Sequence, residues 1–228
     1  MIHSVLSSKW TKIPVFFLCL APLGWLVWDG VHHRLGANPI EFITHATGEW
    51  TLIFLLITLT VTPARKLLRQ PALIRFRRML GLFAFFYGSL HFATYIGLDQ
   101  FFDLLAMMDD ISQRKFITVG LVGFLLLVPL TITSTAGWIR RLGGRRWQVL
   151  HRLVYVSAAA GVVHYYWLVK SDVTEPVRYG LILALLLLYR IVTWIPSRQI
   201  RLPSYRSTNI SAPRTAFDPE VPHMSSRW

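Results

Sequence analysis

The chain has 228 residues, of which 54% are hydrophobic and 15% are charged, and its formal net charge is +13. So many hydrophobic residues with so few charges are unusual in a soluble domain and typical of a protein with several membrane spans. The single cysteine, Cys19, excludes an intrachain disulfide and a cysteine-based metal or iron–sulfur site.

Apolar runs of membrane-spanning length follow one another along the chain. A hydrocarbon layer of ~30 Å needs about 20 helical residues, and short polar segments separate the runs. We therefore predict an all-α membrane protein, a bundle of six transmembrane helices at residues 13–28, 48–62, 79–97, 116–133, 148–169 and 177–195. The pair Thr62-Pro63 is expected to end the second span, because proline cannot continue the hydrogen bonding of a helix.

The connections are short, which predicts one domain over residues 1–197. Gly143-Gly144 is expected to form a flexible turn. Residues 101–110 are apolar on one side and acidic on the other, which is consistent with a short helix on the outer surface, a docking face or an ordinary loop. Residues 198–228 are rich in Ser, Pro and Arg, which predicts a flexible cytoplasmic tail.

The basic residues are unevenly distributed between the connections. With the amino terminus in the cytoplasm, 19 of the 24 basic residues fall on the cytoplasmic side and nine of the eleven acidic residues on the other. The positive-inside rule favours this orientation, with both termini cytoplasmic. The net charge therefore indicates topology rather than a nucleic-acid partner, for which the chain has no reading motif.

Three histidines lie inside the predicted spans: His91, His151 and His164. An ionisable group in a bilayer is a functional hypothesis by default, and neutral imidazole is a common axial ligand of haem iron. A helix rises about 1.5 Å per residue, so His91 and His164 lie about 20 and 26 Å from the cytoplasmic ends of their spans. Their similar depth on different helices predicts ligation of one haem. The alternative for each is a hydrogen bond to a neighbouring helix.

His151 lies near the cytoplasmic side, about 20 Å along the helix from His164. No histidine is available opposite it, but Arg77 lies at that level on nearly the same helix face as His91. A guanidinium stays protonated and is a poor iron ligand, so Arg77 is expected to pair with a haem propionate or to act as a topology charge. Thirteen residues leave His151 and His164 about 140° apart on an ideal helix, so a bend or bulge is required. His45 is expected to be a solvated loop residue.

At these residues the chain resembles the MsrQ family, also called YedZ, the membrane haem subunits of a bacterial periplasmic methionine sulfoxide reductase system. The resemblance covers about residues 40–195. The stretches that carry it are Thr47-Gly48-Glu49-Trp50, Thr60-Val61-Thr62-Pro63, Arg77-Arg78-Met79-Leu80-Gly81-Leu82, Tyr87, Leu90-His91, Tyr95, Trp147, Leu150-His151-Arg152-Leu153, Tyr155 and His164-Tyr165-Tyr166-Trp167.

The resemblance implies a ferric reductase-like transmembrane domain, the group that includes NADPH oxidases. It implies that His91 and His164 hold an outer haem b and that His151 holds one side of an inner haem. Arg77 stands where the oxidases have a histidine, so one or two haems are implied. The resemblance also implies FMN, for which these residues indicate no site.

The implied role is electron delivery across the bacterial inner membrane. The donors would be a cytoplasmic flavin reductase or the quinone pool, and the acceptor a periplasmic molybdoprotein, MsrP, which reduces methionine sulfoxide in periplasmic proteins. No catalytic residue is expected on this chain. The alternatives are a ferric or quinone reductase of the same fold that needs no partner, and a proton-coupled transporter that uses the histidines as a relay.

Overall fold

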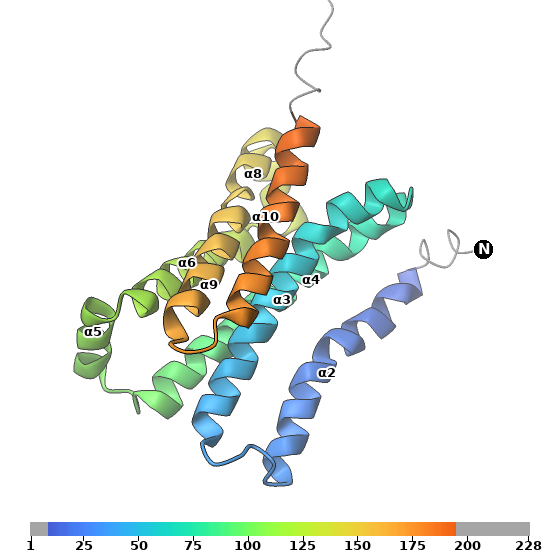
Figure 1. Ribbon diagram of the computed structural model, residues 1–228. Helices are drawn as coiled ribbons and strands as arrows, with labels where there is room; N and C mark the ends of the chain where they lie inside the picture. Colours follow the sequence, from blue (N-terminus) through green and yellow to red (C-terminus); the bar gives the residue numbers. More distant parts are fainter. Residues whose placement is uncertain (1–8, 195–228) are drawn as a thin grey trace, which may run out of the picture.

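The structure is a computed structural model that describes residues 9–194, and every regular element in that part of the chain is helical (Figure 1). The expected tail at 198–228 lies outside the described residues. The long helices are α2 (Lys12–Val31), α3 (Pro39–Leu67), α4 (Ile74–Thr94), α6 (Lys115–Ile132), α9 (Leu153–Leu168) and α10 (Thr174–Trp194). The short ones are η1 (Lys9–Thr11), η2 (Pro71–Leu73), η3 (Tyr95–Asp99), α5 (Leu104–Gln113), α7 (Ala136–Leu142) and α8 (Gly144–Leu150).

Five helical segments in the described chain are long and apolar enough to cross a membrane. They are α2, α3, α6, most of α10, and the continuous stretch of η2, α4 and η3 over Pro71–Asp99. The predicted class, an all-α multi-pass membrane protein, is confirmed. The remaining expected span, 148–169, differs because it is divided between α8 and α9, and α9 has only 16 residues.

The division falls at His151 and Arg152. The amide of Arg152 donates to the carbonyl of Val149 at 3.1 Å, and the amide of Tyr155 donates to the carbonyl of Arg152 at 3.0 Å. These bonds span three residues instead of the four of an α-helix, so the backbone is locally wound more tightly. The spacing of His151 and His164 requires an irregularity of this kind, and α8 begins at the expected glycine turn, where Gly143 has φ +74°.

The expectation that Thr62-Pro63 ends the second span is wrong, because α3 continues through Pro63 to Leu67. A proline removes only one amide donor, and the helical bonding beyond it is intact, with the amide of Leu68 donating to the carbonyl of Ala64 at 2.9 Å. In an apolar layer a helix satisfies nearly all backbone groups internally, so continuing it is favoured over a break.

The core lies where α3 packs on α4 and α6 packs on α9. Small residues allow α6 and α9 to approach closely: the Ser157 hydroxyl donates to the Gly123 carbonyl at 2.8 Å, and a Cβ added at Gly123 would lie 3.1 Å from the Cβ of Ala160. Such contacts are typical of helix pairs in membranes, where close packing replaces the hydrophobic effect between helices.

Helix α2 runs along the edge of the bundle (Figure 1) and is attached to α4 by a buried hydroxyl. The Tyr87 hydroxyl accepts from the Leu23 amide at 3.1 Å and donates to the Cys19 carbonyl at 2.9 Å. In an uninterrupted helix those two backbone groups bond to each other. Tyr87 therefore bridges α2 next to Pro22, and its side chain is 1% exposed.

Candidate functional site

The structure brings His91 of α4 and His164 of α9 together. Their ring centroids are 6.0 Å apart, and the ring planes are inclined at 78°. The two residues come from helices that are far apart in sequence, at the depth that helix rise predicts. We call this end of the bundle the paired-histidine end.

A backbone carbonyl holds each of the two rings. Nδ1 of His91 donates to the carbonyl of Thr44 on α3 at 2.9 Å, and Nδ1 of His164 donates to the carbonyl of Phe116 on α6 at 2.7 Å. A carbonyl oxygen can only accept, so each Nδ1 carries the proton and each Nε2 keeps its lone pair. Histidines that ligate metals typically have this second bond, which selects the tautomer and orients the ring.

The separation of the rings suits a single metal atom between them. Imidazole nitrogens bind metals at about 2 Å, so nitrogens on opposite sides of one metal stand about 4 Å apart, with ring centroids about 6 Å apart. The observed centroid distance of 6.0 Å matches this spacing. The residues present therefore fit a haem: the two neutral imidazoles would hold its iron, and the haem would supply one-electron chemistry.

Two glycines lie directly against the paired histidines. A Cβ added at Gly120 would lie 2.6 Å from Nδ1 of His164, and one added at Gly48 would lie 3.0 Å from Nδ1 of His91. The rings occupy the space that side chains on α6 and α3 would fill. Gly48 belongs to a stretch that carries the family resemblance. Gly120 is a site residue that the sequence analysis missed, and the only signal for it in the sequence is a glycine within an apolar span.

Other polar residues at the paired-histidine end were not predicted as part of a site. His45 lies on helix α3 rather than in a loop, and it lines a pocket of about 330 Å³ with Glu41 and residues 168–172. The Tyr179 hydroxyl of α10 donates to Glu49 of α3 at 2.7 Å. This bond joins two spans and involves neither His91 nor His164.

His151 lies apart from the pair, where α8 ends against α6. Its Nε2 is 3.2 Å from the Thr133 hydroxyl, and its ring stacks on Trp147 with centroids 3.9 Å apart. That hydroxyl donates to the Pro129 carbonyl at 2.6 Å, so it accepts from Nε2–H of His151. The lone pair of a neutral His151 is then on Nδ1.

The two histidines of the divided span contact the two ends of α6. His164 bonds to Phe116 in the first turn of α6, and His151 bonds to Thr133, the residue directly after α6. Thr133 lies 17 positions after Phe116, a separation that corresponds to about 25 Å of helix. The irregular turn at His151 thus leaves both histidines of the divided span against α6, at opposite ends of the bundle.

Two arginines, Arg77 and Arg190, lie near one another, and Arg77 also lies near His151. Arg77 of α4 is half-buried, and it lies close enough to His151 and Arg190 for its positive charge to act on both side chains. Arg190 of α10 donates to the Thr62 hydroxyl at 2.8 Å and stacks over Tyr155, with 5.5 Å from the guanidinium carbon to the ring centroid. The ion pairs found within residues 9–194 involve neither arginine. Sequence reasoning missed Arg190, although a lone arginine late in an apolar span was the available signal.

Two features define the class of this protein: a bundle of membrane-spanning helices, and a pair of adjacent histidines on two of these helices. The family described as ferric reductase like transmembrane component matches residues 46–162, from α3 into α9. The match includes His91 and His151 and ends two residues before His164.

Curated relatives narrow the class further. A protein of Herminiimonas arsenicoxydans is 54% identical over 182 residues, covering 79% of this chain and 84% of the relative. One of Rhodospirillum rubrum is 54% identical over 194 residues, covering 85% of this chain and 93% of the relative. Both are named protein-methionine-sulfoxide reductase heme-binding subunit MsrQ. The chain belongs to the MsrQ family.

Proposed function

We propose that this protein is a haem-binding electron-transfer subunit of a methionine sulfoxide reductase system. The observation that carries the proposal is the adjacent pair His91 and His164, with ring centroids 6.0 Å apart and with Nδ1 of each ring bonded to a backbone carbonyl, which leaves the lone pair on Nε2. The names of the relatives describe a haem-binding subunit of that kind, which supports the same function here.

In this proposal α4 and α9 hold one haem b between His91 and His164. The haem supplies one-electron transfer, and the protein sets its position, ligands and surroundings. The carbonyls of Thr44 and Phe116 keep Nε2 of each histidine available and make the imidazoles better donors. The surrounding apolar spans keep water away from the site.

At the other end we propose a second haem b, with His151 as one ligand. Arg77 and Arg190 would pair with its propionates. The support is chemical: Arg77 lies near both His151 and Arg190, both arginines are half-buried, and the ion pairs found within residues 9–194 include neither of them. Unbalanced charge is costly in that setting, and propionates would offset it.

The proposed direction of transfer is outward across the bacterial inner membrane, with cytoplasmic termini. The donors would be a cytoplasmic flavin reductase or the quinone pool, and the acceptor a periplasmic molybdoprotein, MsrP. The distribution of basic residues supports the orientation. FMN stays a prediction of the family resemblance, and the fluorescence of an acid extract of the purified protein would test it.

The haem proposal is tested by His91→Ala and His164→Ala. Either change removes one axial ligand, so the reduced-minus-oxidised spectrum of the purified protein should lose most of the signal of this haem. His45→Ala is the matched control, because His45 is exposed on the same end of the bundle and should leave the spectrum intact. Wild-type spectra from both site variants would overturn the assignment.

The partner proposal is tested by purification from membranes of the native organism. We expect a soluble molybdoprotein to bind the chain and to accept electrons from its dithionite-reduced form in a stopped-flow mixing experiment. A ferric or quinone reductase that needs no partner would instead be reoxidised by ferric chelates or quinones, and would leave the molybdoprotein oxidised.

A further inference from the structure

Helix α5 carries an exposed apolar stripe that no part of the described chain covers. The stripe consists of Leu104, Leu105 and Met108 on α5 with Phe101 and Phe102 just before it, and each side chain is between 69% and 81% exposed. Such a contiguous apolar surface on one side of a short helix is typical of a binding surface.

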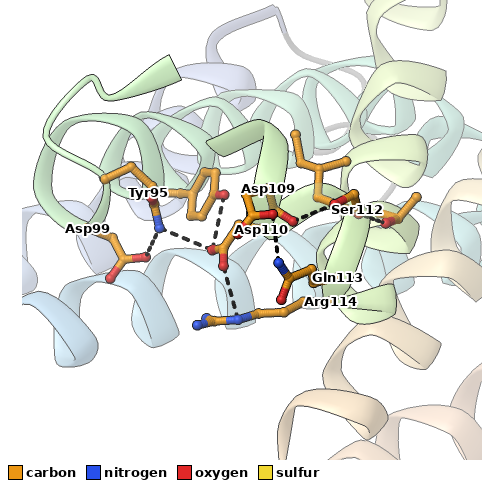
Figure 2. A network of polar contacts seen from close by, with 10 residues as sticks. Tyr95, Asp99, Asp109, Asp110, Ser112, Gln113 and Arg114 are labelled. Carbon is orange, nitrogen blue, oxygen red and sulfur yellow. Dashed lines mark hydrogen bonds and ion pairs between the residues drawn. The ribbon is translucent and has the colours of Figure 1, made fainter. Parts of the chain in front are cut away.

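The orientation of α5 is determined by contacts on its other sides. Met107 is buried against the bundle, with 8% of its surface exposed. Asp110 joins α5 to the π-helical turn η3: it accepts from the Tyr95 hydroxyl at 3.4 Å and from Gln100, the residue after η3, at 3.1 Å, and it pairs with Arg114 at 3.0 Å (Figure 2). These contacts fix the rotation of α5, and they therefore determine the direction in which the stripe faces.

The backbone before α5 is strained where it leads into the stripe. Phe101 and Phe102 have φ values of +47° and +64°, a region that bulky residues rarely adopt. Both rings are nevertheless more than 70% exposed. Strain of this kind persists only where surrounding contacts impose it, and it points to a functional role for the segment.

The depth of α5 in the membrane follows from its neighbour. Helix α6 has 18 residues and spans about 27 Å, close to the ~30 Å of a hydrocarbon layer, so its first residue, Lys115, lies at the layer's edge. A single residue, Arg114, separates α5 from α6, and Figure 1 shows α5 turned away from the line of α6. Helix α5 therefore lies at the level of the lipid headgroups.

We propose that α5 lies on the surface of the bilayer and seats its apolar stripe at the boundary between headgroups and acyl chains. The occupant is lipid because α5 lies between the end of one span, at Asp99, and the start of the next, at Lys115, so its exposed apolar stripe is held at the edge of the hydrocarbon layer. Asp109 and Gln113, on another side of α5, face water.

The test is spin labelling of the full chain in lipid vesicles. Cysteines are introduced one at a time into Cys19→Ala protein, at Leu105 and Met108 in the stripe and at Ala106 and Gln113 as matched controls on the same helix. Oxygen concentrates in lipid and a nickel chelate in water, so the ratio of the two collision rates reports the surroundings of each label. We expect a ratio several-fold higher at the stripe positions than at the controls.

Two outcomes would overturn the proposal. Equal, water-like ratios at all four positions would place α5 away from the bilayer. Protection of the stripe labels from both reagents would show that protein covers the stripe, either a second copy of the chain or a partner. The haem spectrum of each variant is recorded in parallel, so failure of this proposal is distinguishable from failure of the haem site.

Discussion

At the scale of single residues, the paired histidines depend on what surrounds them as much as on their own chemistry. An imidazole in an apolar span could be satisfied by one hydrogen bond and do nothing more. Here Nδ1 of each ring donates a hydrogen bond to a backbone carbonyl, so the lone pair is on Nε2. A glycine next to each ring leaves the space that the ring occupies. These details support the proposal that the two histidines are ligands and not residues that only join helices.

The glycine contacts give a test that leaves both histidines in place. Gly120→Ala would put a methyl group within 2.6 Å of the His164 ring, so the ring must move and haem binding should fall several-fold. Gly24→Ala is the control, because a Cβ there meets nothing within 4 Å. Haem content per protein, measured as the pyridine haemochrome, checks the prediction; equal content in both variants would contradict it.

His151 permits a prediction about the number of haems. If it ligates a second haem, His151→Ala should lower the haem content of the protein without abolishing it, because the His91–His164 site lies at the other end of the bundle. His91→Ala should remove the signal of the haem at the His91–His164 site and keep the signal of the haem at His151. Unchanged haem content in the His151 variant would indicate a single haem.

The two arginines near His151 should affect redox potential more than haem content. Arg77→Gln or Arg190→Gln removes a positive charge, and reduction of a haem adds negative charge to it. The midpoint potential of the second haem should therefore become more negative, while that of the other haem stays nearly constant. A potentiometric titration checks this; an equal shift of both haems would argue against local pairing.

At the scale of helices, the irregular features lie near the histidines of the proposed haem sites. The tightened turn at His151 divides the fifth expected span, and the π-helical turn η3 begins four residues after His91. Departures from regular helix geometry are frequent at functional sites, because they turn side chains to faces that an ideal helix does not offer. Helix α2 is interrupted next to Pro22, where the Tyr87 hydroxyl bridges its backbone, and it is held to the bundle by few contacts.

The attachment of α2 can be tested at Tyr87. Tyr87→Phe removes the hydroxyl that bridges α2, but the Leu23 amide and the Cys19 carbonyl can then bond directly to each other. We therefore expect a modest loss of stability, about 1 kcal/mol, with haem content unchanged. Thermal unfolding in detergent measures it. Tyr87→Leu, which also leaves a cavity at this fully buried position, should destabilise the protein more.

At the scale of the whole molecule, the imidazoles mark two levels of the bilayer. His91 and His164 lie near one end and His151 near the other, with α6 running between them. Two redox centres at these levels would divide the crossing into shorter steps, which suits a protein that moves electrons without moving a substrate.

The orientation can be measured independently of haem. In Cys19→Ala protein, a membrane-impermeant maleimide should label Ser171→Cys, in the exposed α9–α10 connection, from the periplasmic side of intact spheroplasts. Arg141→Cys, exposed on α7, should react only after the membrane is opened. The reverse pattern would contradict the charge-based topology and the proposed direction of electron transfer.

The amino-acid sequence by itself determined the class of fold, the approximate positions of the spans and the matched depth of His91 and His164. Hydropathy is a property of each segment alone, and the rise of a helix is constant, so depth can be counted along the chain. The charge asymmetry is likewise visible without any knowledge of packing.

Only the tertiary structure decided how side chains from different helices meet. The continuation of α3 through Pro63, the tight turn at His151, the bridging hydroxyl of Tyr87, the glycine at 120 and the placement of Arg190 beside Arg77 were beyond sequence reasoning. Each depends on a neighbour that lies close in space and far away in sequence, and no local pattern records which neighbour that is.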